Sequence, residues 1–404
     1  MKMILMLRLL LLASMIGCRA HSPKIAAIVA RAHRDGIDLP SLPFAEAAFQ
    51  SIEVISRANT TELDFTNATR VDTHGQYFVS FCSSVTIGIV FLTDDETVHA
   101  VPDFYYALVP DTGGRPTPAW DVATHLRFMA NHSISHAVLS ISTPVSNVFL
   151  GNQTLSIGLA RLLNEWLAEL VQAFPKRFSF FAVAPLPYVS ASMTEVNYAL
   201  QELHARGVGL LTNHEGLYLG HPDLRPFFAS LNSTSDRSPP IFVHPTSPFL
   251  RINGSLVEAN PTLYPTGLVE YYFETARTML DLTLTQSFVN FTNIRWLFSH
   301  CGGAFPPIED RALKLQPAIE VPAKAVYGSR VWYDSAGPTY FAQVKGLLGY
   351  GVPTSQLVFG SDYPYAPGTY DSGIGAIQEA EFLSDQEKEA VFSSNYEAVL
   401  GEVM

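Results

Sequence analysis

The chain has 404 residues, 48% of them apolar, and a formal net charge of −12 at pH 7. This length and apolar content suit one barrel-sized domain with an extension, or two ordinary domains. The acidic balance and the absence of a basic run argue against nucleic acid or an anionic membrane surface as a partner.

The first twenty residues (1–20) have the layout of a secretory signal peptide. Lys2 precedes a short apolar core, and a small-residue exit ends at Ala20. An uncleaved membrane anchor is the alternative, but the stretch is too short to span a bilayer comfortably. We therefore predict cleavage near Ala20 and no stable membrane association of the mature chain.

Seven N-glycosylation acceptors point to the same route. Seven of the fourteen asparagines in the chain are acceptors. Chance placement of Ser or Thr two residues later would give roughly two. We expect a secreted glycoprotein or a resident of the secretory pathway. The acceptors are Asn59, Asn67, Asn131, Asn152, Asn232, Asn253 and Asn290.

Two cysteines, Cys82 and Cys301, remain after the predicted cleavage. They could form one disulfide in an oxidising compartment or stay unpaired, and the sequence leaves both outcomes open. There is no metal-binding cysteine pattern. A bound metal would therefore need histidine and carboxylate ligands.

Residues 21–69 are predicted to form an N-terminal helical extension. The segments 24–34 and 44–57 have helical patterns, and the breaker stretch DGIDLPSLP separates them. The main domain is expected to follow, over residues 70–404.

From residue 70 onward, short apolar runs alternate with helical patterns, of which 156–173 is the clearest. This alternation predicts parallel βα units, and eight of them indicate an α/β fold closed as a (β/α)8 TIM barrel. An open doubly wound sheet is the alternative, but the first strand lacks the glycine-rich dinucleotide turn. The eight predicted strands are 70–74, 136–141, 178–183, 207–212, 241–244, 294–300, 330–335 and 357–362.

Several predicted strands end in a potential ligand or acid–base group. These groups are His74, His244, His300 and Asp362. One strand-end histidine is usually a structural residue. In barrels, however, the chemistry gathers at the carboxyl ends of the strands, so four such groups at one end indicate a site.

The stretches IFVHPTSP, WLFSHCGGAFP and VFGSDYPYAP, in this order, resemble the amidohydrolase-superfamily decarboxylases. The chain is most similar to the fungal 6-methylsalicylate decarboxylase group, which is related to aminocarboxymuconate-semialdehyde decarboxylase. The resemblance runs from about residue 70 to the C-terminus. It implies one divalent ion, Zn²⁺ or Mn²⁺, held by a His-x-His on the first strand, by His244 and by Asp362. It also implies that His300 is an acid–base residue beside the substrate.

The first-strand motif departs from the family pattern. His74 matches its first histidine, but Gln76 stands where the second is expected. Removal of residues 76–98 would restore RVDTHGHAVPDFYYALV, so we infer that His99 is the second ligand. Residues 76–98 would then be an insertion, either a retained intron or a genuine loop. Gln76 as a weak ligand, or a displaced His99 that leaves three protein ligands, are the alternatives.

Other residues have weaker assignments. Asp72 could orient His74 as a hydrogen-bond acceptor, or could cap the barrel floor. His214 could face the pocket, whereas the remaining histidines are expected to be structural or at the surface. Candidate aromatic pocket residues near strand ends are Phe104, Tyr105, Phe305, Tyr363 and Tyr365.

A metal site of this kind can act as a Lewis acid and orient an anionic oxygen. The resemblance implies non-oxidative decarboxylation of a 6-methylsalicylate-like ortho-hydroxybenzoic acid to m-cresol and CO2, in fungal polyketide secondary metabolism. Either His300 or Asp362 would deliver the proton. The alternatives are a metal-dependent amidohydrolase or lactonase, and a secreted pseudoenzyme with an interrupted metal site. A homodimer is compatible with the family.

Overall fold

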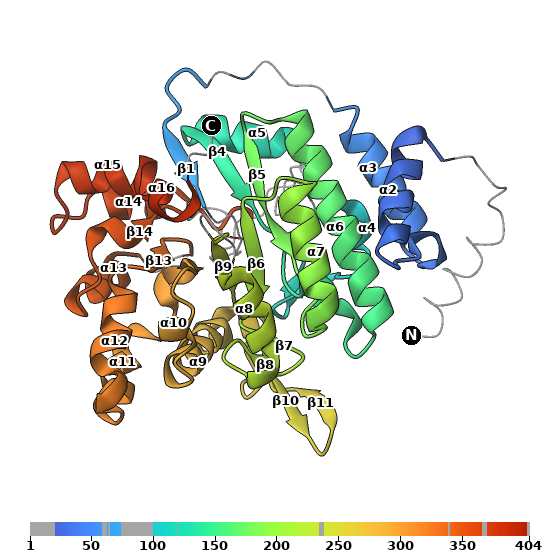
Figure 1. Ribbon diagram of the computed structural model, residues 1–404. Coiled ribbons are helices and arrows are strands. Elements are labelled where there is room, and N and C mark those ends of the chain that lie inside the picture. The colour runs from blue at the N-terminus through green and yellow to red at the C-terminus, as the bar shows by residue number, and fades with distance from the viewer. Residues whose placement is uncertain are drawn as a thin grey trace.

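The computed structural model describes residues 21–58, 63, 65–73, 100–118, 120–233, 238–337, 340–365 and 370–401. Eight parallel strands form one curled sheet in the order β1-β4-β5-β6-β9-β12-β13-β14, with helices around it (Figure 1). The predicted (β/α)8 barrel is therefore confirmed. Its strands are β1 (Arg70–Asp72), β4 (Ile134–Leu139), β5 (Phe178–Val183), β6 (Gly207–Leu211), β9 (Ile241–His244), β12 (Trp296–Phe298), β13 (Val331–Asp334) and β14 (Leu357–Val358).

The first and last strands of the sheet are joined just beyond their carboxyl ends. The backbone N–H of Thr73 donates to the carbonyl oxygen of Phe359 over 3.0 Å, and the Thr73 hydroxyl donates to the same oxygen over 2.7 Å. One residue earlier, a carboxylate oxygen of Asp72 accepts from the backbone N–H of Ser361 over 3.0 Å. These contacts close the barrel.

The barrel interior is filled by apolar side chains from successive strands. The rings of Phe181 on β5 and Phe242 on β9 stack with centroids 5.1 Å apart. Gly209 lies on the intervening strand β6, where a Cβ atom would already contact Phe181 at 3.4 Å, so its lack of a side chain gives the two rings room to meet. Each such buried ring contributes about 1.5–3 kcal/mol. The same cluster contains Val71, Val138, Leu297, Trp332 and Val358, together with Tyr396, Val399 and Leu400 of the C-terminal helix α16 (Asn395–Leu400).

Amphipathic helices cover the outside of the barrel, and the longest is α6, where the sequence predicted a helix over 156–173. Asn152 caps it by accepting from the backbone N–H of Leu155 over 3.2 Å. No helix in the described part of the chain is long and apolar enough to cross a membrane. The barrel helices are α4 (Asp103–Tyr106), α5 (Val122–Asn131), α6 (Gln153–Ala173), α7 (Val189–Gln201), α8 (Arg225–Asn232), α9 (Glu270–Leu284), α10 (Ser287–Asn290), α11 (Pro306–Lys314), α12 (Pro317–Tyr327), α13 (Tyr340–Gly349), α14 (Tyr370–Gln378), α15 (Asp385–Ser393) and α16 (Asn395–Leu400).

Three short antiparallel ribbons are inserted in the loops. The ribbon β10–β11 directly follows the strand that ends at His244, and it projects from the body of the molecule (Figure 1). The ribbons are β2 (Asp111–Thr112) with β3 (Arg115–Pro116), β7 (Asn213–His214) with β8 (Leu217–Tyr218), and β10 (Phe249–Ile252) with β11 (Ser255–Glu258).

In the described part of the chain, the helices α2 (Pro23–Arg34) and α3 (Ala45–Ile55) precede the barrel, close to the predicted segments 24–34 and 44–57. They lie against the outer face of α6 (Figure 1). Gly158 of α6 permits this approach, because a Cβ atom there would come within 2.2 Å of Leu42. The predicted signal peptide lies outside the described residues.

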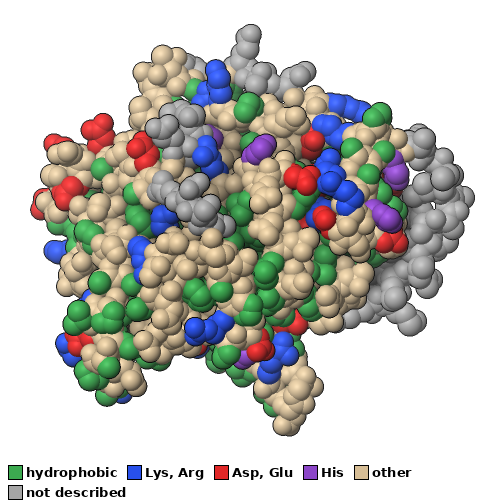
Figure 2. Space-filling view, in the orientation of Figure 1, with side chains coloured by type: hydrophobic (Ala, Val, Ile, Leu, Met, Phe, Trp, Pro, Cys, Tyr) green, Lys and Arg blue, Asp and Glu red, His purple; other side chains and the backbone are tan. Residues whose placement is uncertain are grey.

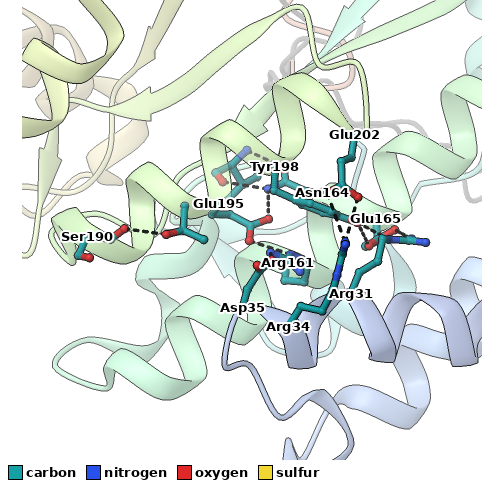
Figure 3. Close-up of polar contacts among 12 residues, drawn as sticks. Arg31, Arg34, Asp35, Arg161, Asn164, Glu165, Ser190, Glu195, Tyr198 and Glu202 are labelled. Carbon is teal, nitrogen blue, oxygen red and sulfur yellow. Dashed lines mark hydrogen bonds and ion pairs between the residues drawn. The ribbon is translucent and has the colours of Figure 1, made fainter.

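Buried charges also tie α2 to the barrel (Figure 3). The Arg161 side chain on α6 is fully buried and donates to Asp35 over 2.6 Å and to Glu195 of α7 over 2.8 Å. Arg31 of α2 donates to Glu165 of α6 over 2.7 Å. Burial raises the pKa of Glu195, and the charge of Arg161 opposes that shift. The extension is thus joined to α6 by ion pairs as well as apolar packing.

The visible surface in Figure 2 carries acidic and basic side chains side by side over the junction of α2 with α6 and α7. The ion pair of Arg34 with Glu202, 3.2 Å between nitrogen and oxygen, belongs to this region, and both side chains are about half exposed or more. Unlike the Arg161 pair, it is open to solvent and is expected to contribute little to stability.

Candidate active site

Three of the residues predicted at strand ends meet at the carboxyl end of the barrel. His244 is the last residue of β9, and His300 and Asp362 follow β12 and β14. The Nε2 atom of His300 lies 3.8 Å from an Oδ2 atom of Asp362. The rings of His244 and His300 have centroids 5.7 Å apart. All three residues are buried, with 5–6% of their surface exposed.

The two proton-carrying candidates have unusual backbone conformations. His300 has a φ of 54° and Asp362 a φ of 63°, both in the left-handed region that non-glycine residues rarely adopt. Such positions cost on the order of 1–3 kcal/mol each and persist only where surrounding contacts hold them. Strain of this kind tends to gather at functional sites.

Contacts from two neighbouring elements hold the His300 turn. The backbone N–H of His300 donates to Asp334, at the end of β13, over 2.9 Å. The Gln343 side chain on α13 donates to the His300 carbonyl over 3.1 Å and to the Gly303 carbonyl over 3.0 Å. Gly303 is required here, because a Cβ atom would lie 2.6 Å from the Tyr272 carbonyl oxygen. This packing accounts for the second glycine of SHCGG.

Asp362 is positioned by a contact from β1, the strand that β14 meets where the barrel closes. The preceding residue, Ser361, donates from its backbone N–H and from its hydroxyl to the two carboxylate oxygens of Asp72 on β1. The Ser361 hydroxyl also accepts from the backbone N–H of Tyr363 over 3.0 Å. Asp72 therefore fixes the backbone beside Asp362. Its predicted role toward His74 stays a prediction, because His74 lies outside the described residues.

Two consecutive tyrosines at the start of α9 flank the histidines. The ring of Tyr271 packs edge-on to His244 with centroids 6.1 Å apart, and the ring of Tyr272 lies 5.7 Å from His300. Sequence reasoning missed both. The available signal was the pair of adjacent tyrosines in the helix that follows the β10–β11 ribbon.

Of the five aromatic residues predicted to line the pocket, four pack in the core or against a loop, and one lies near the site. Phe104 and Phe305 are buried in the core, and Tyr363 stacks on Phe128 with ring centroids 3.5 Å apart. The Tyr105 hydroxyl braces a loop by donating to the Ser142 carbonyl over 2.7 Å. Only Tyr365 is half-buried near the site. Burial raises its pKa to about 12, and the negative charge of Asp362 adds to the shift.

Buried histidines outside the site have structural partners. The Nε2 atom of His214 accepts from the backbone N–H of Leu211 over 3.2 Å, and its Nδ1 atom lies 3.4 Å from the side-chain nitrogen of Asn147. The Nε2 atom of His136 lies 3.0 Å from the Ser179 hydroxyl, and His125 packs among aromatic rings. Burial lowers the pKa of His214 and of His125 to about 3, and that of His136 to about 4.

The described residues supply part of a metal site. In that part of the chain no group of three or more His, Cys, Asp or Glu side chains is arranged to hold an ion by itself. His244 and Asp362 are the two predicted ligands within it, and an imidazole nitrogen and a carboxylate oxygen suit Zn²⁺ or Mn²⁺. The remaining predicted ligands, His74 and His99, lie outside the described residues, as does the segment 76–98.

Cys301 lies directly after His300 and is 1% exposed. It is a free thiol in the structure, and burial raises its pKa above the usual range. A buried protonated thiol is a poor nucleophile, so no catalytic role is assigned to it. Cys82, its candidate disulfide partner, lies outside the described residues.

Comparisons with known proteins identify fungal relatives of this chain. Decarboxylase yanB of Aspergillus niger is 31% identical over 67% of this chain and 76% of its own length. The 6-methylsalicylic acid decarboxylase acuB of Aspergillus aculeatus is 30% identical over 67% of this chain and 83% of its own length.

Solved structures share the fold. The crystal structure of an amidohydrolase II superposes with a TM-score of 0.68 at 25% identity, covering 83% of this chain and all of that chain. The 5-carboxyvanillate decarboxylase of Novosphingobium aromaticivorans, complexed with manganese and 4-hydroxy-3-methoxy-5-nitrobenzoic acid, superposes with a TM-score of 0.63 at 17% identity, covering 86% and 99%. The amidohydrolase family model matches residues 71–401, from the first barrel strand to the end of the last helix. The chain therefore belongs to the amidohydrolase family.

Proposed function

We propose that the protein is a metal-dependent, non-oxidative decarboxylase of an ortho-hydroxybenzoic acid of the 6-methylsalicylate type, acting in fungal secondary metabolism. The observation that carries the proposal is the buried pair of His300 and Asp362, 3.8 Å apart, beside His244 at the carboxyl end of the barrel. The names of the relatives yanB and acuB support a decarboxylase, and the name of acuB supports the substrate class.

A divalent ion would be held by His244 and Asp362, together with His74 and His99. When bound, such an ion acts as a Lewis acid toward the carboxylate and phenol oxygens of the substrate. The manganese in the 5-carboxyvanillate decarboxylase favours Mn²⁺, with Zn²⁺ as the alternative. Residues 76–98 separate His74 from His99 in the sequence. Deletion of this segment tests whether both histidines bind the ion.

The chain's own residues would carry the proton. Either the His300 Nε2 atom or the Asp362 carboxylate, 3.8 Å apart, would deliver a proton to the ring carbon that bears the carboxylate. The bond to the carboxylate then breaks, CO2 leaves, and its bonding electrons restore the aromatic ring. The rings of Tyr271 and Tyr272 cover the two histidines, which limits the access of water to them.

The test is CO2 release from 6-methylsalicylate by the purified protein, with Mn²⁺ or Zn²⁺ added and with a chelator. We expect chelator-sensitive release in equal amount with m-cresol. The control variant is His33→Gln, which should release CO2 as the parent protein does, because His33 is exposed on α2, remote from the site. Hydrolysis of lactones or amides without CO2 release would overturn the proposal in favour of an amidohydrolase. Substrate binding without either reaction would favour a pseudoenzyme.

We further propose that the chain is glycosylated in the secretory pathway. Among the described acceptors, Asn67, Asn131, Asn152, Asn253 and Asn290 are exposed, which supports their accessibility. Asn232 is half-buried, and its side-chain oxygen accepts from Asn293 over 2.9 Å, so we expect little modification there. Enzymatic removal of N-glycans from the protein expressed in a fungal host should lower its apparent mass. An unchanged mass would contradict the proposal.

A further inference from the structure

A cavity lies close to the candidate active site. It is a cavity of about 420 Å³ at the carboxyl end of the barrel, between the loops that follow β4 and β9. Thr143 lines it from the first loop, Thr246 and Ser247 line it from the second, and Tyr271 from α9. We call this space the distal cavity. Thr246 is two residues beyond His244, on the loop that follows the predicted metal ligand.

Tyr271 links the cavity to His244. Its ring packs against His244 on one side, with centroids 6.1 Å apart, and its side chain also lines the distal cavity. Its hydroxyl is hydrogen-bonded to the side chain of Thr143. Thr143 in turn donates to the Thr246 hydroxyl over 2.7 Å. A continuous row of hydroxyl groups therefore runs along the inner wall, from the active-site side into the cavity.

The charges of the lining exclude one class of occupant. Among the described residues that line the cavity, Asp111 and Glu258 are carboxylates, both exposed at its rim, and none is a lysine or an arginine. A second carboxylate on a ligand would find repulsion there and no cation to pair with. Buried hydroxyl and amide groups, as on Thr143, Thr246 and Asn147, are instead suited to uncharged oxygen atoms.

The cavity is also large for the substrate class. Pockets of roughly 300–1,000 Å³ hold drug-sized ligands. A single-ring acid whose carboxylate is held at His300 and Asp362 would leave most of this space unfilled. A ligand group in the cavity would therefore have to fill this volume and match the uncharged, hydroxyl-bearing wall.

We propose that the distal cavity binds an uncharged, oxygen-bearing substituent of the substrate, so that the preferred substrate is an ortho-hydroxybenzoic acid larger than 6-methylsalicylate. The carboxylate end faces His300 and Asp362, and the substituent passes Tyr271 into the cavity. This inference rests on the proposed function, because it assigns the orientation of the acid from the decarboxylation site.

The first test compares four acids that differ only in one substituent: 6-methylsalicylate, 6-pentylsalicylate, 6-(hydroxypentyl)salicylate and 6-(carboxybutyl)salicylate. We expect kcat/KM for the hydroxypentyl acid to exceed that for the methyl acid by about tenfold or more. The carboxybutyl acid should be the poorest of the long-chain acids. Equal or lower kcat/KM for the hydroxypentyl acid than for the methyl acid, or a carboxybutyl acid as good as the hydroxypentyl acid, would overturn the proposal.

Variants then locate the effect. Val148 lines the cavity from the short helix Val145–Phe149, and Val148→Trp should fill part of the space. We expect it to lower the ratio of kcat/KM for the hydroxypentyl acid to that for the methyl acid by about tenfold. Val54→Trp, at an exposed position of α3, is the matched control. Val54→Trp should leave the ratio unchanged. If Val148→Trp also leaves it unchanged, the cavity does not bind the substituent.

The hydroxyl row is tested separately by Thr143→Val, which keeps the side-chain shape, and by Thr143→Ser, which restores the hydroxyl. The preference for the hydroxypentyl over the pentyl acid should fall in the first variant and return in the second. A preference that survives Thr143→Val would contradict hydrogen bonding in the cavity.

A binding measurement keeps this inference separate from the proposed reaction. The phenols that correspond to the methyl and hydroxypentyl acids need no decarboxylation to bind, so calorimetry measures their affinities directly. Tighter binding of the longer phenol, lost in Val148→Trp, would support the cavity even if no CO2 is released. Failure of CO2 release together with equal phenol affinities would overturn both proposals.

Discussion

The carboxylate of Asp334 accepts a hydrogen bond from the backbone N–H of His300 over 2.9 Å. The same oxygen accepts from the backbone N–H of Ala336 over 3.0 Å. Asp334 is fully buried at the end of β13, so a carboxylate on one strand fixes the turn that follows the neighbouring strand, β12. The orientation of the His300 imidazole therefore depends on a residue that need not touch the substrate.

We expect Asp334→Asn to lower kcat by about 10- to 100-fold, because the acid–base group of His300 would no longer be held in place and a small misplacement can cost about 100-fold. KM should change little, because the amide has the same shape and the substrate contacts remain. Steady-state kinetics with 6-methylsalicylate measure both. The exposed Asp223→Asn is the matched control. An unchanged kcat in a folded Asp334→Asn protein would refute the positioning role.

Substitution of the proton carriers should have a larger effect. We expect His300→Gln and Asp362→Asn each to lower kcat by about 10²- to 10⁴-fold, the usual contribution of a positioned acid or base. The two variants should differ in metal content, because Asp362 is a predicted ligand and His300 is not. Elemental analysis should find metal retained in His300→Gln and reduced in Asp362→Asn. Equal metal content in both would remove Asp362 from the ligand set.

Stability should fall at acidic pH because of three buried histidines. The pKa values of His125, His136 and His214 are lowered to about 3, 4 and 3 in the folded chain, against 6.5 for the unperturbed side chain. The unfolded state therefore binds more protons below pH 6.5, and the free energy of unfolding decreases as pH falls toward 4. Each histidine contributes about 1.4 kcal/mol per pH unit in this window.

Thermal unfolding between pH 7.5 and pH 4.5 measures this dependence. His136→Asn should make the stability less dependent on pH below about pH 6.5, because one of the three histidines that bind a proton on unfolding is removed. Replacement of the exposed His33 by Asn should leave the curve unchanged. A His136→Asn curve parallel to that of the parent protein would contradict the assignment.

The buried ion pairs of the extension should matter more than the exposed one. Arg161→Met leaves the carboxylate of Glu195 buried without its cation, and we expect a loss of about 3–5 kcal/mol. Arg34→Met, which breaks the exposed pair with Glu202, should cost less than about 1 kcal/mol. Urea unfolding compares the two variants. A double variant, Arg161→Met with Glu195→Leu, should recover part of the loss, and an equal cost for the two single variants would argue against a special role of burial.

Removal of residues 76–98 tests the inference about the first-strand motif. The shortened chain reads RVDTHGHAVPDFYYALV, with Gly75 joined to His99. If His74 and His99 are both ligands, the shortened chain should bind one divalent ion per chain at least as tightly as the full chain. Competition with a chelator measures the affinity. Weaker binding after the deletion would favour a genuine loop that contributes to the site.

Much of the fold and part of the site could be predicted from the sequence. His244, His300 and Asp362 each stand at or just after an apolar run, and parallel strands bring such positions together at one edge. The strands proved shorter than predicted at several carboxyl ends, because backbone turns begin before His300 and Asp362. Local pattern recognises the apolar run but not the residue at which the chain leaves the sheet.

The missed residues depend on contacts between distant segments. Tyr271 and Tyr272 lie on a helix, and their approach to the histidines follows from the path of the chain through the β10–β11 ribbon. The contact between Asp334 and His300 joins a side chain to a backbone amide on another strand. His214 shows the converse, since its sequence position suggested the pocket whereas its ring bonds to the backbone of Leu211. A periodic pattern carries no information about such contacts.

The contacts that join β1 to the end of the sheet have a consequence for the order of folding. The Thr73 N–H and the Phe359 carbonyl are 286 residues apart in sequence, and Asp72 and Ser361 are 289 apart. During synthesis the first strand must therefore wait for almost the whole chain before its second neighbour appears, and contacts of such high sequence separation form slowly. Until then its free edge is open to incorrect pairing. Because Asp72 binds the residue beside Asp362, the last strand to arrive also completes the site. A chain that stalls or is cut before Ser361 would therefore lack closure and catalysis together.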